Sequence, residues 1–167
     1  MLFRVMTYNI LDGGENRAAH ILKVIQSTNP DVVILQEVYT EEFLQFLSQE
    51  VGMKNYFGTG NKQRKVALLS KLPVRSFKSH HPILPTWRKF IDAEIEIIPK
   101  RTVRIVGVHP MANLGFAFEA WRFLEASFIV KYVQKDNEQF SLIAGDFNAI
   151  APGEKVNTQS MPTWLKW

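Results

Sequence analysis

A carboxylate and an amide stand two positions apart in one short segment of this chain. Asp146 and Asn148 follow an apolar run that breaks at Gly145. On an extended backbone, residues i and i+2 point to the same side, so both side chains are expected to face one site, with Phe147 turned into the packing. The acid can activate a water molecule and the amide can bind a charged oxygen, which suits phosphate-ester hydrolysis. The same residue types also favour an Asx-type turn, and that interpretation stays open.

Three further polar residues are expected at the ends of other apolar strands. Asn9, Glu37 and His109 each follow or close such a run. Strand ends at one edge of a sheet are where α/β folds commonly bind ligands. Each residue alone is compatible with a turn, a solvated strand end or a structural histidine. Four such endings in one chain predict a common site.

Helices and strands are expected to alternate in the first third of the chain. Asn16 is expected to cap a first helix, and Asn29 and Pro30 to stop it. Thr40 is expected to cap a second helix that Gly52 ends. The apolar positions of the two helices are Ala18, Ile21, Leu22 and Ile25 in the first and Phe43, Phe46 and Leu47 in the second.

The remaining chain is expected to form short strands around one long helix. Strands are expected at residues 3–10, 31–38, 55–57, 66–69, 74–77, 90–98, 102–108 and 142–145. In the strand 90–98, acidic residues alternate with apolar ones, which predicts a half-buried strand. Pro99 and Lys100 are expected to form a hairpin turn. The long helix is expected over 114–132, with Leu114, Phe118, Trp121, Leu124 and Phe128 on one face.

Length and composition predict a single soluble domain over residues 1–167. The chain is 46% hydrophobic and 22% charged, which allows a sizeable core. It has no apolar run near the roughly 18 residues of a membrane span, and strand-like sequence begins too early for a signal peptide. The absence of cysteine excludes disulfides and thiolate metal sites. It fits a reducing compartment, so a cytoplasmic location is expected.

Positive charge is concentrated in the middle of the chain. Residues 54–104 contain twelve Lys and Arg against three Asp and Glu, a net charge of +9 in a chain of +4 overall. Such a field attracts polyanions. Lys62, Arg64 and Lys65 are expected to contact an anionic substrate, although any single basic residue is also compatible with a solvated surface.

Five residue runs together resemble the endonuclease/exonuclease/phosphatase superfamily, which has the deoxyribonuclease-I-like fold. The runs are MTYNIL (6–11), PDVVILQEV (30–38), ALLSKLPV (67–74), VGVH (106–109) and GDFN (145–148). The resemblance implies an α/β (α+β) fold, a four-layer sandwich of two mixed β-sheets flanked by helices. It also implies metal-dependent hydrolysis of phosphate esters with Mg²⁺, or alternatively Mn²⁺. The implied partner is a phosphate-ester substrate, and nucleic acid is one class that the superfamily uses.

The resemblance also implies a role for each polar residue at a strand end. Glu37 resembles the metal-binding glutamate of the superfamily, and Asn9 the asparagine beside it. His109 resembles the histidine that contacts the phosphate and assists the leaving group. Asp146 resembles the aspartate that orients or deprotonates the attacking water, and Asn148 the phosphate-binding asparagine. Magnesium prefers oxygen ligands and keeps several waters, so one or two carboxylates suffice.

Asp12 adds a further carboxylate beside this set. It follows the MTYNIL run and could supply another oxygen ligand. Because Gly13 and Gly14 come directly after it, a role in a turn is favoured over a role as a ligand.

The C-terminal segment departs from the superfamily pattern. The resemblance implies further strands and a terminal Asp-His pair, whereas the nineteen residues after Asn148 contain neither Asp nor His. The fold is therefore expected to be truncated at that end, and the incomplete sheet to favour self-association. The alternative function is a catalytically incomplete family member, or a fragment, that binds polyanions. If another residue replaces the terminal histidine, His80 or His81 is the first expectation.

Overall fold

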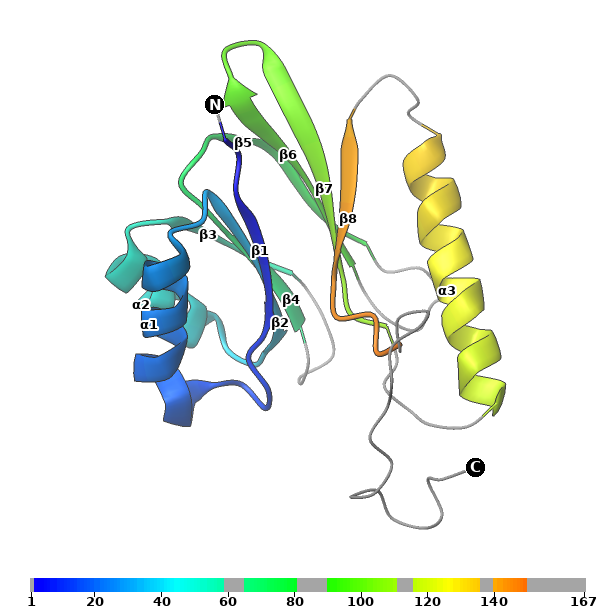
Figure 1. Cartoon of the computed structure of the whole chain (residues 1–167), viewed down its shortest axis with the longest axis horizontal. Coiled ribbons are helices and arrows are strands. Elements are labelled where there is room, and N and C mark those ends of the chain that lie inside the picture. Colours follow the sequence, from blue (N-terminus) through cyan, green and yellow to red (C-terminus); the bar gives the residue numbers. More distant parts are fainter. Residues whose placement is uncertain (1, 59–64, 81–89, 111–115, 136–139, 150–167) are drawn as a thin grey trace.

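Two four-stranded β-sheets face each other, with helices against their outer faces. The structure, a computed structural model, describes residues 2–58, 65–80, 90–110, 116–135 and 140–149. Figure 1 shows α1 and α2 on one side of the sandwich and α3 on the other. The order of layers is helix, sheet, sheet, helix, which confirms the predicted four-layer α/β sandwich. The prediction of one domain over 1–167 reaches beyond the described residues and stays a prediction.

The first sheet comes from the N-terminal part of the chain, in the strand order β1-β2-β4-β3. Its strands are β1 (Val5–Asn9), β2 (Val32–Val38), β3 (Lys54–Phe57) and β4 (Lys65–Ser70). β1 and β2 are parallel, so their carboxyl ends lie at the same edge, and β4 is antiparallel to both β2 and β3. Every residue of β2 is buried, as a continuous apolar run between two covering layers requires.

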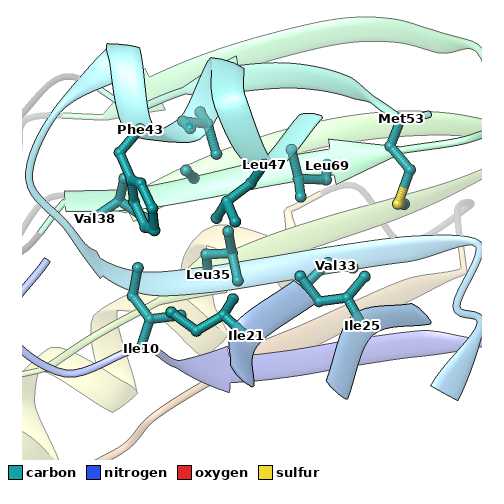
Figure 2. Packing of buried hydrophobic residues seen from close by; sticks show 12 residues of the cluster. Ile10, Ile21, Ile25, Val33, Leu35, Val38, Phe43, Leu47, Met53 and Leu69 are labelled. Atoms are coloured by element: carbon teal, nitrogen blue, oxygen red, sulfur yellow. The ribbon is translucent and has the colours of Figure 1, made fainter. Parts of the chain in front are cut away.

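Helices α1 (Ala18–Thr28) and α2 (Glu41–Val51) cover the outer face of the first sheet. Ile21 and Ile25 of α1 and Phe43 and Leu47 of α2 form one cluster with Leu35 of β2 (Figure 2). The cluster anchors both helices, because burial of each such side chain contributes about 1.5–3 kcal/mol.

The predicted boundaries of α2 are confirmed, whereas the predicted cap of α1 is wrong. The Thr40 hydroxyl accepts a hydrogen bond from the Phe43 backbone amide at 3.2 Å, and Gly52 ends α2 with a φ of 64°. A 3₁₀ turn over Glu15–Arg17 precedes α1, so Arg17 rather than Asn16 occupies its N-cap. Helix α2 also lies rotated from the expected face.

The rotation of α2 exchanges two residues on its apolar face. Phe46 is 41% exposed, whereas Leu44 is completely buried. The spacing therefore gave the buried face of α2 only in part, whereas the predicted face of α1 is confirmed, since Ile21 and Ile25 are buried and Ala18 and Leu22 pack against the same cluster.

The second sheet has the strand order β5-β6-β7-β8. Its strands are β5 (Val74–His80), β6 (Phe90–Ile98), β7 (Arg101–Val108) and β8 (Ser141–Gly145). β6 and β7 form the predicted hairpin with a turn at residues 99–100, and β8 lies parallel to β7. Helix α3 (Phe116–Gln134) covers the outer face, where Ile129 packs with Phe90, Val106 and Val108.

A third cluster fills the space between the two sheets. It includes Ile34 and Leu68 of the first sheet and Ile91 and Ile105 of the second. The sheets approach closely at Gly107, where an added Cβ would lie 2.7 Å from Ile91 Cγ1 and 2.9 Å from Ile34 Cγ2. A side chain at this position would force the layers apart, and overpacking of this kind costs about 1–3 kcal/mol.

Helix α3 departs from its predicted apolar face. Leu124 is 46% exposed, whereas the charged residues Arg122 and Glu125 are buried. Leu114 and the side chain of Phe118 lie outside what the structure describes.

None of the described helices is long and apolar enough to cross a membrane.

Asp92 is buried together with Arg104 in an ionic network beneath α3, which corrects the half-buried pattern predicted for 90–98. Its carboxylate accepts from Arg104 Nη2 at 2.8 Å and from the Tyr132 hydroxyl at 2.6 Å, and that hydroxyl lies 2.9 Å from His80 Nε2. Burial alone would raise the pKa of Asp92, but the hydrogen bonds from Arg104 and Tyr132 outweigh it and lower the pKa. Because α3 covers this face of β6, the acidic residue is buried with its partners.

Candidate active site

Four strand ends meet at one edge of the sandwich. Asn9 is the last residue of β1, and Glu37 precedes the last residue of β2. His109 directly follows β7, and Asp146 directly follows β8. The two parallel strand pairs therefore bring their carboxyl ends together, one pair from each sheet, and the predicted convergence of these residues is observed.

The side-chain amide of Asn9 joins the two sheets. Asn9 Nδ2 donates to Glu37 Oε1 at 3.3 Å and to Asp146 Oδ2 at 2.9 Å. Asn9 Oδ1 accepts from the backbone amide of Leu11 at 2.9 Å. This third bond fixes the orientation of the amide, so its two N–H groups point at the two carboxylates.

A β-bulge orients Glu37 toward the site. Between Leu35 and Val38 of β2 lie two residues, whereas their partners in β4, Ala67 and Lys65, are separated by one. The extra residue interrupts the ladder, and Glu37 adopts a φ of 64°. This conformation is uncommon for a residue with a Cβ, and strained positions of this kind cluster at functional sites.

The Glu37 carboxylate is enclosed by groups from three other segments. Its Oε2 atom accepts from the backbone amide of Asp12 at 2.8 Å. Its Oε1 atom faces Asn9 and lies 3.7 Å from His109 Nε2. Glu37 as a whole is 8% exposed. The carboxylate is thus held in place from both sides, while a small part of it remains accessible.

Asp146 is held by an Asx turn, the second of the two interpretations that its sequence allows. Asp146 Oδ1 accepts from the backbone amide of Asn148 at 2.9 Å, and Asn148 has a φ of 50°. β8 ends at Gly145, so the extended backbone assumed for these residues is wrong. Phe147 is 38% exposed and does not turn into the core. The turn nevertheless directs Asp146 into the site.

Asn148 is engaged with a neighbouring loop. Its Nδ2 atom donates to the carbonyl oxygen of Pro110 at 2.9 Å. An amide nitrogen has two hydrogens, so the second remains available for an anionic ligand. Asn148 therefore lies at the rim of the site and is connected to the segment that follows β7.

Gly145 allows β7 and β8 to approach closely beside the site. A Cβ at Gly145 would lie 1.9 Å from the carbonyl oxygen of Val108. Because that atom belongs to the backbone, no side-chain rearrangement could relieve the overlap. The close approach places Asp146 next to the strand end that carries His109.

The predicted substrate-binding lysines and arginine are placed only in part. Lys62 and Arg64 lie outside the described residues. Lys65 begins β4 opposite Val38, so it lies at the same edge of the first sheet as Glu37, and its ammonium group is 4.3 Å from the centre of the Phe57 ring.

Several other basic residues of the middle segment are committed to internal contacts. Arg104 pairs with Asp92 beneath α3, and Arg75 pairs with Glu96 across two strands. The net charge of +9 for residues 54–104 already counts Asp92 and Glu96, so these pairs leave the excess of positive charge unchanged. His80, one candidate to replace the terminal histidine, belongs to the network beneath α3 rather than to the site.

The oxygen donors of the site fit a magnesium ion in type. Within the described ranges, no group of three or more His, Cys, Asp and Glu side chains is arranged to hold a metal. Glu37 and Asp146 supply two carboxylates that share one amide donor. Magnesium is usually bound through one or two carboxylates and keeps several waters, so this set is sufficient without a third.

Solved structures share this fold at low sequence identity. A search of curated proteins gives no match. TDP2 from Caenorhabditis elegans matches with a TM-score of 0.72 and 22% identity over 89% of this chain and 48% of that one. The human Nocturnin catalytic domain with bound sulfate anion has a TM-score of 0.71 and 22% identity, over 89% and 64%. D. rerio TDP2 complexed with single strand DNA product has a TM-score of 0.69 and 18% identity, over 89% of this chain and 62% of that one.

The chain spans about half the length of the C. elegans structure that it matches. The family model matches residues 6–167, which include every strand end described above. The chain belongs to the Endonuclease/Exonuclease/phosphatase family.

Proposed function

We propose that this chain carries the active site of a metal-dependent phosphoester hydrolase. The observation that carries the proposal is the arrangement of two carboxylates, one from each sheet, around the single amide of Asn9. Glu37 would hold Mg²⁺ or Mn²⁺ together with Asn9. Once bound, the ion would neutralise negative charge that develops on the phosphate.

Asp146 is proposed to accept a proton from the attacking water. Each of its carboxylate oxygens already accepts one hydrogen bond, from Asn9 and from the Asn148 backbone. These bonds fix the orientation of the carboxylate and leave a second lone pair on each oxygen for water. A positioned base of this kind contributes about 10²–10⁴-fold to the rate.

Asn148 and His109 are proposed to act on the phosphate. The second N–H of the Asn148 side chain would donate to a phosphate oxygen. The His109 side chain is only 2% exposed and its Nε2 lies 3.7 Å from Glu37. His109 would reach a phosphate only after the site rearranges around a substrate. Before that rearrangement it lies beside Glu37.

Nucleic acid is the proposed substrate class. The D. rerio TDP2 structure holds a single strand DNA product. In this chain, Lys65 lies at the same edge of the first sheet as Glu37, and Lys62 and Arg64 precede it in the sequence. Basic residues at the edge of the site would attract the phosphate backbone.

The proposal is tested by turnover of single-stranded DNA and of bis(p-nitrophenyl) phosphate with Mg²⁺, with Mn²⁺ and with a chelator. Wild-type turnover should require the metal, and Glu37→Gln and Asp146→Asn should each lower it at least about 100-fold. Glu50→Gln on the exposed surface of α2 is the charge-matched control and should retain wild-type rates. Metal-independent turnover, or full activity in either site variant, would overturn the assignment.

A second candidate function is polyanion binding without hydrolysis. It is favoured by the burial of His109, which keeps that ring from an external phosphate in this structure. Salt-sensitive binding of single-stranded DNA with no turnover under any of the metal conditions would support this candidate over the first.

A further inference from the structure

Residues 11–14 form a left-handed turn directly after β1. Leu11, Asp12, Gly13 and Gly14 have φ values of 51°, 46°, 78° and 73°. The left-handed conformation is unfavourable for a residue with a Cβ, and successive residues rarely share it. Since the first two residues of this turn are not glycines, contacts elsewhere must hold them in place.

Three consecutive backbone amides of the left-handed turn donate hydrogen bonds to Asn9 and Glu37. The amide of Leu11 donates to Asn9 Oδ1 at 2.9 Å. The amide of Asp12 donates to Glu37 Oε2 at 2.8 Å, and the amide of Gly13 to the Glu37 carbonyl oxygen at 3.1 Å. The turn thus fixes both the side chain and the backbone of Glu37.

Two side chains brace the left-handed turn from outside. The Tyr39 hydroxyl donates to Asp12 Oδ1 at 2.9 Å. Arg17 Nη2 donates to the Ile10 carbonyl oxygen at 2.6 Å and also to that of Leu11. In these contacts both side chains hold the turn, whose backbone amides in turn bind Glu37.

The Tyr39 ring also packs against the backbone of the turn. A Cβ at Gly13 would lie 2.8 Å from Tyr39 Cδ2, so only glycine leaves room for this ring. Together with Arg17, the ring and the turn line a pocket of about 270 Å³. The brace therefore lies on the accessible side of the turn, next to Glu37.

We propose that Tyr39 and Arg17 are positioning residues for Glu37, acting through the left-handed turn. This inference rests on the proposed function, in which Glu37 binds a divalent metal. The hydroxyl of Tyr39 holds Asp12 so that its backbone amide meets Glu37 Oε2, and Arg17 holds the carbonyl groups at the start of the turn. Partners that orient a metal ligand typically contribute 10–100-fold to metal affinity.

The test compares Tyr39→Phe with the matched control Tyr56→Phe. Both remove one hydroxyl and keep the ring, and Tyr56 packs on Phe77 in another part of the fold. Mn²⁺ affinity is measured from the electron paramagnetic resonance signal of the free ion. Tyr39→Phe and Arg17→Met should each weaken binding about 10-fold, and Tyr56→Phe should not.

A second readout follows the turn itself. Hydrogen exchange of the Asp12 backbone amide, measured by NMR, should accelerate by up to about 10-fold in Tyr39→Phe, because a hydrogen bond is worth up to that factor in equilibrium. In an Asp12→Ala variant, adding Tyr39→Phe should not change the exchange rate of this amide further, since the Tyr39 hydroxyl acts through Asp12 Oδ1.

The outcomes separate the two proposals. Unchanged exchange of the Asp12 amide in Tyr39→Phe, an equal effect of Tyr56→Phe, or additivity with Asp12→Ala would each overturn the positioning role. If the wild-type chain binds no Mn²⁺, the proposed function fails, whereas the exchange rate of the Asp12 amide still decides whether Tyr39 holds the turn.

Discussion

Asn9 Nδ2 lies 3.3 Å from Glu37 Oε1 and 2.9 Å from Asp146 Oδ2, so one amide separates two carboxylates that belong to different sheets. Replacing this amide with a third carboxylate should lower the stability of the fold more than removing the amide does. We expect Asn9→Asp to lower the melting temperature below that of Asn9→Ala, because the new charge faces two like charges. Thermal unfolding of both variants, with Asn55→Asp and Asn55→Ala on β3 as the matched pair, measures this difference.

The left-handed backbone of Glu37 predicts an inverted response to glycine. In an ordinary strand, glycine is about 0.5–1 kcal/mol less stable than alanine. At a φ of 64°, alanine carries the strain and glycine does not. Glu37→Gly should therefore be about 1 kcal/mol more stable than Glu37→Ala, by denaturant unfolding.

The control for this comparison is Lys78, an exposed residue in the middle of β5. There the order should be normal, with Lys78→Gly less stable than Lys78→Ala. The same normal order at Glu37 would show that its backbone is not strained in solution.

The buried pair of Asp92 and Arg104 predicts strong coupling. Arg104 donates to Asp92 through Nη2 at 2.8 Å and through Nε at 3.1 Å. Arg104→Met leaves a buried carboxylate without its cation and should cost about 3–5 kcal/mol. The double variant with Asp92→Leu should recover most of this loss. Chemical unfolding of the two single variants and the double variant gives the coupling energy, and additive effects would contradict it.

Tyr132 predicts a loss of stability at high pH. Burial and the hydrogen bond to Asp92 raise the pKa of Tyr132 to about 12. Because the folded state favours the neutral phenol, this contribution is complete below the unfolded-state pKa of about 10 and is lost as the pH rises toward 12. Unfolding free energies of wild type and Tyr132→Phe should therefore converge between pH 10 and 12. A constant difference across that range would argue against the raised pKa.

The charge at the site edge predicts the salt dependence of DNA binding. Replacing Lys62, Arg64 and Lys65 by Gln should reduce the slope of log affinity against log salt by up to about 2, since each phosphate contact on a single strand adds about 0.7. The charge-matched control replaces three basic residues at the opposite edge of the sheets, Lys54, Lys100 and Arg101. An equal change of slope in both triple variants would indicate a diffuse field rather than a substrate-binding edge.

The strand ends of the site could be predicted because burial fixes them. A run such as that of β2 is apolar at almost every position, since layers cover both of its faces, and Glu37 interrupts it. Thr40 and Gly52 were equally predictable, because capping depends on residues adjacent in sequence. Local rules of this kind failed at the start of α1, where a 3₁₀ turn places Arg17 rather than Asn16 at the N-cap.

Contacts between distant segments explain what sequence patterns did not predict. The alternation around Asp92 shows which residues share a face of β6, but not that α3 covers that face. Glu37 has no local signal for a left-handed backbone, because the groups that hold it come from residues 9–13. The Asx turn at Asp146 competed with an extended strand end, and the two cannot be distinguished without the neighbouring Asn9.

Within the strands that the structure describes, the chain passes from the first sheet to the second once, between Ser70 and Val74. A cut there would leave Asn9 and Glu37 in one fragment and Asp146 in the other. Neither fragment could bring the two carboxylates together alone, and each would expose the apolar face that the sheets share. The molecule is thereby suited to fragment complementation, in which recovered metal binding or turnover reports that two separately expressed halves have met.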